Sequence, residues 1–172
     1  MEKPGPARRG ESMDDCRWMD AALSEAALAR RKGEVPVGAV IVKEGRVLGR
    51  GHNKVETKKR ATAHAEIIAI ESASKALGDW RLDGCTLYVT VEPCHMCLGA
   101  AYLARIARVV YGARQPRSGA CGSVDDFHEA ELFNHRIEVI GGVRETECLA
   151  LLQEFFGAVR AGDDTRRDAR AG

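Results

Sequence analysis

The chain of 172 residues is 45% hydrophobic and carries a formal net charge of +1, a composition that fits one globular domain with a core of ordinary size. Its longest apolar run, residues 35–42, is far shorter than the roughly 20 residues that cross a bilayer, so it predicts a buried strand and no membrane span. The N-terminal residues hold no apolar stretch suited to a signal peptide, so we expect a cytoplasmic protein whose six cysteines are thiols or metal ligands more than disulfides.

The first half of the chain predicts a helix, a pair of strands and a second helix. Apolar residues at helical spacing favour a helix over residues 14–31. The segment 33–54 then predicts two strands joined by a tight turn at residues 44–45. A second helix is expected over residues 63–77, with Thr62 as its N-cap.

The second half predicts further alternation of strands and helices. In chain order we expect a strand over 85–92, a helix over 94–106, a strand over 107–113, a short helix from Val124, a strand over 135–142 and a helix over 146–160. Alternation without an internal linker is typical of one α/β layer domain. We divide the chain into a disordered extension (1–13), one domain (14–161) and a disordered tail (162–172).

Basic residues are concentrated in two stretches. Residues 43–60 contain seven Lys or Arg and two Glu, and residues 93–124 contain four Arg and no acidic residue. Such runs are often only solvated faces. Because both stretches lie beside the candidate site residues described next, they also suit a polyanionic substrate.

Three possible zinc donors lie within the segment VEPCHMCLGA. Cys94 and Cys97 are three residues apart, so at the start of a helix they share a face and can bind a single ion. His95 lies about 100° from Cys94 and about 200° from Cys97 at helical pitch, so it does not join them. A zinc site needs more than two protein ligands, and the others must therefore come from elsewhere in the chain.

The best remote donor is His64, at the beginning of the second predicted helix. Two helix N-termini can converge where connections leave neighbouring strands, which predicts one His and two Cys ligands with a fourth tetrahedral position left for water. An open position of this kind is typical of catalytic zinc. Glu66 is then a natural acid/base beside that water. Since residues two apart in a helix point to opposite sides, His64 must lie at the edge of the first turn.

The order H-x-E followed by P-C-x-x-C, with Pro93 directly before Cys94, is a signature of zinc nucleobase deaminases. Over about residues 15–160 the chain further resembles the bacterial tRNA-specific adenosine deaminases. The matching stretches are EVPVGAV from Glu34, GHN from Gly51, TAHAE from Thr62, LYVTVEPC from Leu87, RVVYGAR from Arg108, SGACGS from Ser118, NHRIE from Asn134 and ECLALLQEFF from Glu147.

This resemblance implies a fold and a reaction. The fold is the three-layer α/β/α arrangement of the cytidine deaminases, in which helices flank a central mixed five-stranded sheet. The reaction is the hydrolytic deamination of the wobble adenosine to inosine in the anticodon of an arginine tRNA. It implies a homodimer with one Zn²⁺ per subunit, which binds the anticodon stem-loop close to the subunit interface with the target base flipped out.

The resemblance also implies the role of each site residue. The zinc ligands would be His64, Cys94 and Cys97, and Glu66 would be the catalytic proton shuttle. The expected substrate-binding residues are Asn53 and the backbone N–H of Ala65 at the target base, Gln115 in a loop beside the neighbouring nucleotides, and Phe156 next to the anticodon loop.

Two positions depart from the family pattern. Gln115 stands where members usually carry an acidic residue, which leaves the preference for RNA or DNA open. His95 stands where a small apolar residue is more common, and it either packs at an interface or contacts a substrate phosphate or base.

Two other functions remain consistent with these residues. A deaminase of free cytidine, deoxycytidylate or guanine would keep the zinc set but would not need the two basic stretches. A zinc-stabilised RNA-binding module without catalysis would need a fourth protein ligand, such as His95 or Cys85, and no water on the metal.

Overall fold

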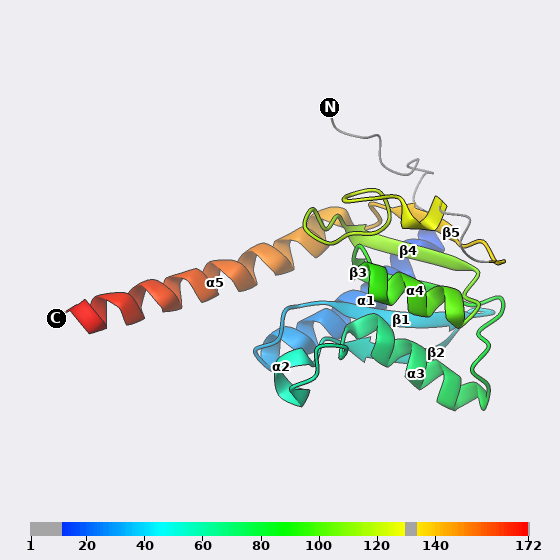
Figure 1. Cartoon of the computed structure of the whole chain (residues 1–172), viewed down its shortest axis with the longest axis horizontal. Helices are drawn as coiled ribbons and strands as arrows, with labels where there is room; N and C mark the ends of the chain where they lie inside the picture. The colour runs from blue at the N-terminus through cyan, green and yellow to red at the C-terminus, as the bar shows by residue number, and fades with distance from the viewer. Residues whose placement is uncertain (1–11, 130–133, 172) are drawn as a thin grey trace.

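The computed structural model describes residues 12–129 and 134–171, with side chains up to residue 162 (Figure 1). Its strands are β1 (Gly38–Lys43), β2 (Arg46–His52), β3 (Thr86–Val91), β4 (Arg108–Ala113) and β5 (Glu138–Gly141). Its α-helices are α1 (Met13–Arg31), α2 (Val55–Lys58), α3 (Ala65–Leu77), α4 (His95–Leu103) and α5 (Glu145–Ala171), and a 3₁₀ helix spans Phe127–Glu129. Among the described residues, none of these helices combines the length and hydropathy needed to cross a membrane.

The strands form one mixed sheet in the order β2-β1-β3-β4-β5. β1 runs antiparallel to both β2 and β3, whereas β3, β4 and β5 are parallel. The turn between β1 and β2 has positive φ at both Glu44 and Gly45, the backbone conformation of the tight hairpin turns whose twist matches that of their strands. The mixed five-stranded sheet predicted from the resemblance is confirmed.

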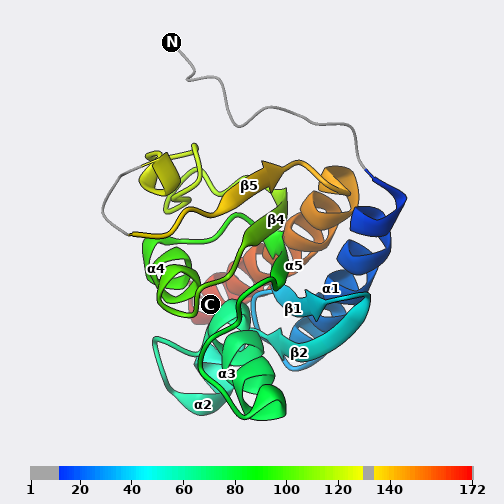
Figure 2. The same ribbon diagram turned by 90° about the vertical axis from the view of Figure 1, so that its right-hand side faces the viewer.

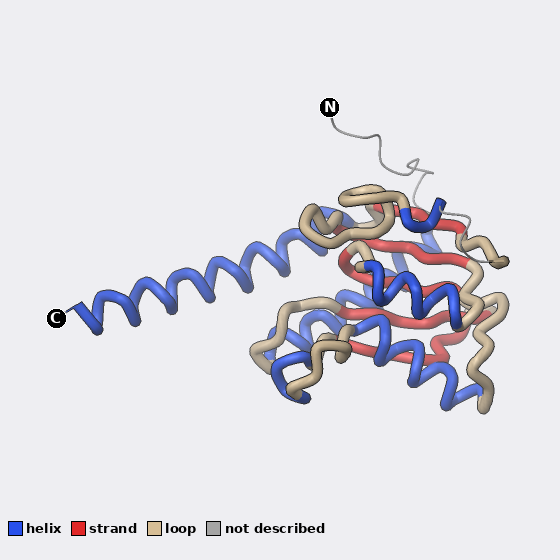
Figure 3. Tube along the Cα trace, viewed as in Figure 1, coloured by secondary structure: helices blue, strands red, loops and turns tan. Residues whose placement is uncertain are grey.

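Helices cover both faces of the sheet (Figures 2 and 3). On one face α3 and α4 pack against alternate residues of the strands, including Ile41, Leu87 and Val109. On the other face α1 and the start of α5 pack against the intervening residues, such as Val40 and Val110. Successive side chains of a strand point to opposite faces of the sheet, and here both sets pack in apolar clusters, so the central strands are apolar on both faces. The result is the three-layer α/β/α arrangement, from which the rest of α5 extends (Figure 1).

Two glycines of β2 let α3 approach the sheet closely. A Cβ added at Gly49 would lie 2.3 Å from the carbonyl oxygen of Ala69, and one at Gly51 would lie 2.2 Å from that of Ala65. Any side chain at these positions would push the helix off the strand. Since His64 directly precedes α3, this packing also fixes the position of a candidate ligand.

Most predicted elements occur within a few residues of their expected bounds, but two helices in the middle of the chain differ, and the last helix is longer than expected. The helix expected over 94–106 ends at Leu103, and Arg105 takes a positive φ of 61° as the chain turns into β4. The short helix expected from Val124 begins at Phe127 and is a single 3₁₀ turn. The four-residue helix α2 was not predicted.

The two predicted end segments fall partly within the described residues. Residues 1–11 of the expected disordered extension lie outside the described residues, while Ser12 caps α1 by accepting a hydrogen bond from the N–H of Asp15. The tail from residue 162 was expected to be disordered, and the structure describes its backbone up to Ala171 as part of α5. This segment holds three Arg and two Ala, which are good helix formers, beside three Asp, one Gly and one Thr, which are poorer ones, and it holds no Pro.

Candidate active site

His64 lies just outside α3, where it is the N-cap residue. Its backbone is extended, with φ −74° and ψ 153°, and its side chain makes no capping hydrogen bond. The prediction of Thr62 as the N-cap is therefore wrong, because the chain stays non-helical for two further residues. Residues two apart in a helix point to opposite sides, but His64 is not helical, so its side chain and that of Glu66 can face the same metal ion.

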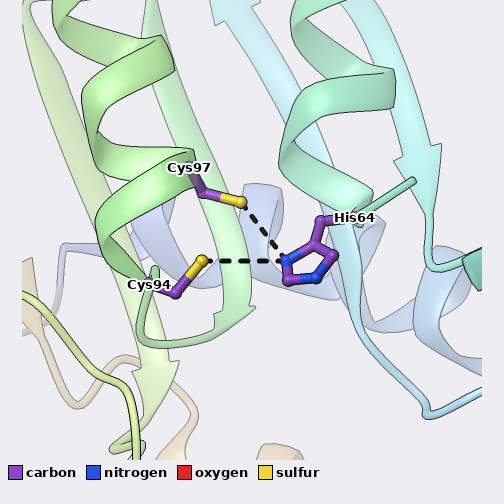
Figure 4. A group of neighbouring side chains, drawn as sticks. All are labelled: His64, Cys94 and Cys97. Carbon is purple, nitrogen blue, oxygen red and sulfur yellow. Dashed lines mark hydrogen bonds between the residues drawn. The ribbon is translucent and has the colours of Figure 1, made fainter. Parts of the chain in front are cut away.

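The two cysteines come from the first turn of α4 (Figure 4). Cys94 is the N-cap residue with extended backbone, and Cys97 is the third residue of the helix. The Nδ1 atom of His64 lies 3.8 Å from the Sγ of Cys94 and 3.5 Å from the Sγ of Cys97. Two helix starts that are 30 residues apart in sequence therefore point their donor atoms at one another.

These three side chains fit a zinc ion. Bond lengths of about 2.3 Å to sulfur and about 2.05 Å to nitrogen at a tetrahedral angle place S and N roughly 3.6 Å apart. The observed Sγ–Nδ1 distances of 3.5 and 3.8 Å agree with that separation. All three donor atoms lie within 4.8 Å of one another, and the described residues add no fourth donor to the group. Three donors are the set expected of a catalytic centre.

The two thiols respond to their surroundings in opposite directions. Hydrogen bonds from Cys97 and His64 lower the pKa of Cys94, although burial opposes them. The hydrogen bond that Cys97 donates to Cys94, together with burial, raises the pKa of Cys97. A negative charge on the Cys94 sulfur thus disfavours a second one on the Cys97 sulfur. A divalent cation bound to both would allow both to be thiolates.

Glu66 is the second residue of α3 and is only 4% exposed. Burial raises the pKa of its carboxyl group. The charge on His64 and the Cys97 thiol act in the opposite direction and lower that pKa. The structure therefore brings Glu66 together with the three candidate ligands, as the sequence predicted.

A cavity of about 290 Å³ opens beside these residues. Its volume is near the lower end of the roughly 300–1,000 Å³ typical of small-ligand sites. Cys97 is not part of its lining, but six other predicted site residues are, namely Asn53, His64, Ala65, Glu66, Cys94 and Gln115. The cavity is of a size to hold a small ring system beside the candidate metal ligands.

Asn53 and Ala65 form one side of this cavity. Asn53 follows β2, and its N–H donates to the carbonyl of Val37 at 3.0 Å, which holds the residue 8% exposed at the edge of the sheet. Ala65 is the first residue of α3, so its N–H is among those that a helix start leaves without a partner within the helix. The side chain of Asn53 and the N–H of Ala65 are therefore available to hydrogen-bond to the polar edge of a ligand in the cavity.

Two other predicted residues lie apart from the cavity lining. Phe156 is on α5, 43% exposed, and its ring makes an edge contact with that of Phe155. His95 lies one residue from Cys94, but its Nε2 is 2.7 Å from a carboxylate oxygen of Asp125 and its ring packs edge-on against Phe127. His95 therefore stands outside the ligand group, and its packing role is the one that the contacts favour.

Two buried glutamates in the cavity wall were missed in the sequence. Glu34 is fully buried and accepts hydrogen bonds from the N–H groups of Glu56 and Thr57 at the start of α2. Glu92, 2% exposed, accepts hydrogen bonds from a segment that begins at Gln115. The sequence does hold a signal for both residues, which is a glutamate at the end of an apolar segment predicted to be a strand, in GEVPVGAV and in TLYVTVE.

The two basic stretches flank the cavity. α2, which provides Val55 and Glu56 to the lining, carries the exposed Lys58, and the exposed Lys59 and Arg60 follow it. On the other side, Arg114 and Arg117 are exposed around Gln115. Exposed basic residues thus adjoin two of the segments that line the cavity, and such residues attract a polyanion.

Comparison with known proteins adds independent information. A family model described as MafB19-like deaminase matches residues 13–160. The tRNA-specific adenosine deaminase of Bacillus subtilis is 50% identical over 143 residues, which cover 83% of this chain and 89% of the relative.

Solved structures are similar as well. One, from a study of A-to-I editing at the wobble position of transfer RNA by tRNA adenosine-34 deaminases, has a TM-score of 0.76 and 44% identity, covering 79% of this chain and 99% of its own. A guanine deaminase from Bacillus subtilis has a TM-score of 0.55 and 45% identity, covering 57% and 63% of the two chains.

Proposed function

Because this chain belongs to the family of the tRNA-specific adenosine deaminases, we propose that it hydrolyses the wobble adenosine of a transfer RNA anticodon to inosine. The observation that carries the proposal is the site itself: His64 and Cys94 of a His-Cys-Cys group line one cavity together with the buried Glu66. The finer proposal is an arginine tRNA as the substrate, a resident zinc ion and a location in the cytoplasm.

Zinc would be held by His64, Cys94 and Cys97. When bound, it supplies a Lewis acid that lowers the pKa of coordinated water from about 15.7 toward 7. Glu66 takes one proton from the attacking water and delivers it to a ring nitrogen of the purine, and then carries the second proton of that water to the amino group, which leaves as ammonia. The net reaction consumes one water and releases one ammonia per adenosine. Asn53 and the N–H of Ala65 orient the base so that its C6 faces the water.

A polyanionic substrate is favoured over a free nucleobase by the charge around the cavity. The exposed Lys58, Lys59 and Arg60 next to one lining segment, and Arg114 and Arg117 next to another, can contact phosphates that flank a flipped base. Free guanine or cytidine offers no such groups. The RNA-binding module without catalysis is disfavoured because the described residues add no fourth donor to the ligand group.

We also propose that the chain forms a homodimer, as the resemblance implies. Two large apolar side chains of α4 support this, because Leu103 is 69% exposed and Met96 is 38% exposed. Light scattering at micromolar concentration measures the mass directly. A monomer mass would contradict the dimer but leave the proposed reaction unaffected.

The test of the substrate uses the zinc-loaded protein and an arginine anticodon stem-loop with a wobble adenosine. We expect inosine at that position, read by sequencing, and conversion at least about 10²-fold slower by the Glu66→Gln variant. Parallel assays of ammonia release from guanine, cytidine and adenosine distinguish the alternative. Release from a free base or nucleoside without conversion of the stem-loop would overturn the proposal.

A further inference from the structure

Glu92 is a buried carboxylate at the end of β3, two residues before the candidate ligand Cys94. It is 2% exposed and lies in the wall of the active-site cavity. Among the described residues, the structure shows no Lys, Arg or His in an ion pair with it. A buried charge without a cationic partner must be stabilised by hydrogen-bond donors, since desolvation is otherwise unfavourable.

All four hydrogen bonds to this carboxylate come from one segment of the chain, residues 115–123. Oε1 accepts from the N–H groups of Cys121 at 2.9 Å and Ser123 at 3.1 Å. Oε2 accepts from the N–H of Gln115 at 3.0 Å and from the hydroxyl of Ser123. The carboxylate thus ties together both ends of a loop that has no helix or strand of its own.

The same loop is joined to the candidate ligand segment by its backbone. The N–H of Ala120 donates to the carbonyl of Pro93 at 2.9 Å, and Gly119 forms an isolated β-bridge with Cys94. Gln115 and Ser118 of this loop line the cavity. Residues 92–94 and 115–123 therefore form one unit that contains both a ligand and a cavity wall.

We propose that Glu92 is a positioning residue that holds the 115–123 loop, and Gln115 in particular, against the substrate cavity. This inference rests on the proposed function, because it assigns the loop to substrate placement in that reaction. Glu92 would act through the loop and not on the reacting atoms.

The close packing around Glu92 shows that the loop is built to receive the carboxylate. A Cβ added at Gly119 would lie 2.4 to 2.6 Å from the carboxyl atoms of Glu92. Gly119→Ala therefore displaces the carboxylate without removing its charge, and provides a second variant by an independent route.

Glu92→Gln has a defined effect on this network. If the amide nitrogen replaces Oε1, the N–H groups of Cys121 and Ser123 both lose their acceptor. If it replaces Oε2, the Ser123 hydroxyl can turn to accept, and only the N–H of Gln115 is left facing a donor. The second orientation is favoured because it leaves fewer buried donors without partners. The variant should therefore release Gln115 selectively.

The experiment compares the zinc-loaded wild type with Glu92→Gln, Gly119→Ala and the control Asp15→Asn. Asp15 is also a buried carboxylate, 4% exposed, but it does not line the active-site cavity. For each protein we would measure KM and kcat on the anticodon stem-loop, zinc content, Tm, and amide hydrogen exchange at Gln115, Cys121 and Ser123.

We expect Glu92→Gln to raise KM about tenfold, in line with one unpaired buried donor, while kcat stays within about threefold and zinc content is unchanged. Exchange at the Gln115 amide should accelerate at least about tenfold. Gly119→Ala should raise KM in the same way. Asp15→Asn should lower Tm without changing KM or the exchange at Gln115.

An unchanged KM in both loop variants would overturn the proposal, as would a fall in kcat alone or an equal rise in KM for Asp15→Asn. If Glu92→Gln does not fold, Gly119→Ala decides between these outcomes. If the wild type does not convert the stem-loop, the proposed function fails. Hydrogen exchange at the Gln115 amide then tests separately whether Glu92 holds the 115–123 loop. Unaltered exchange at Gln115 in both Glu92→Gln and Gly119→Ala would refute that role of Glu92.

Discussion

Asp15 of α1 offers a test of how a buried charge stabilises this fold, at the side of the sheet that carries α1 and α5. Its Oδ1 accepts hydrogen bonds from the hydroxyl of Tyr88 and from Arg108, each at 2.8 Å, and its Oδ2 accepts a second bond from Arg108 at 2.9 Å. Asp15→Asn keeps the shape of the side chain, but its amide nitrogen cannot accept from Arg108.

The expected loss of stability is about 2 kcal/mol. One charge-assisted hydrogen bond contributes about 1.5–3 kcal/mol. The full penalty of about 3–5 kcal/mol for breaking a buried ion pair does not apply, because the side chain of Arg108 is 25% exposed and also lies 3.5 Å from Glu138. At about 2–4 °C per kcal/mol for a chain of this size, Tm should fall by about 4–8 °C.

The pH dependence of this loss follows from the pKa of Asp15. Burial alone would raise that pKa, but hydrogen bonds from Arg108, Tyr88 and Ser12 outweigh it and lower the pKa below its usual value. A lowered folded-state pKa adds stability that is present above the unfolded pKa of about 3.9 and is lost as the pH falls through the folded value. The variant should therefore differ most from the wild type at neutral pH.

Urea unfolding followed by tryptophan fluorescence gives the free energy of unfolding of both proteins between pH 7 and pH 3. The difference should be constant down to about pH 4 and should shrink below it. A difference that grows in acid, or that is below about 0.5 kcal/mol at pH 7, would refute the assignment of Asp15 as a stabilising ionised group.

Three further substitutions test the site and its support. Glu66→Gln should lower kcat by about 10²–10⁴-fold with zinc content unchanged, because it removes proton transfer and keeps the side-chain shape; activity above a tenth of wild type would contradict this. His95→Ala should still bind one zinc per chain in a metal assay, because His95 contacts Asp125 and not the ligand group, and loss of the metal would show that this assignment is wrong. Gly51→Ala should lower Tm and weaken zinc affinity together, since its Cβ would meet the carbonyl of Ala65 at 2.2 Å and push α3 away; unchanged affinity in a chelator competition would argue against that coupling.

Local patterns predicted much of this fold because they depend on neighbouring residues. The turn at Glu44 and Gly45 follows from two adjacent residues that tolerate a tight hairpin, and the helix over 14–31 follows from its apolar periodicity. The meeting of His64 with Cys94 and Cys97 was also predictable, because the cysteines follow β3 and His64 lies in the connection that leaves β2 of the same sheet.

Other features depend on contacts between distant parts of the chain. Glu34 and Glu92 accept from N–H groups 22 to 31 residues away, and no local pattern reports such bonds. The N-cap of α3 was misplaced at Thr62 because residue type favours Thr as a cap, whereas the structure keeps His64 extended and directs its ring toward the cysteines.

The most direct test of the central claim is a zinc titration of metal-free protein, with inosine formation in the arginine anticodon stem-loop as the readout. The account predicts no conversion without zinc, a rate that rises in proportion to added zinc, and saturation at one ion per chain. Conversion by the metal-free protein, or one bound zinc per chain with no inosine at the wobble position, would contradict it.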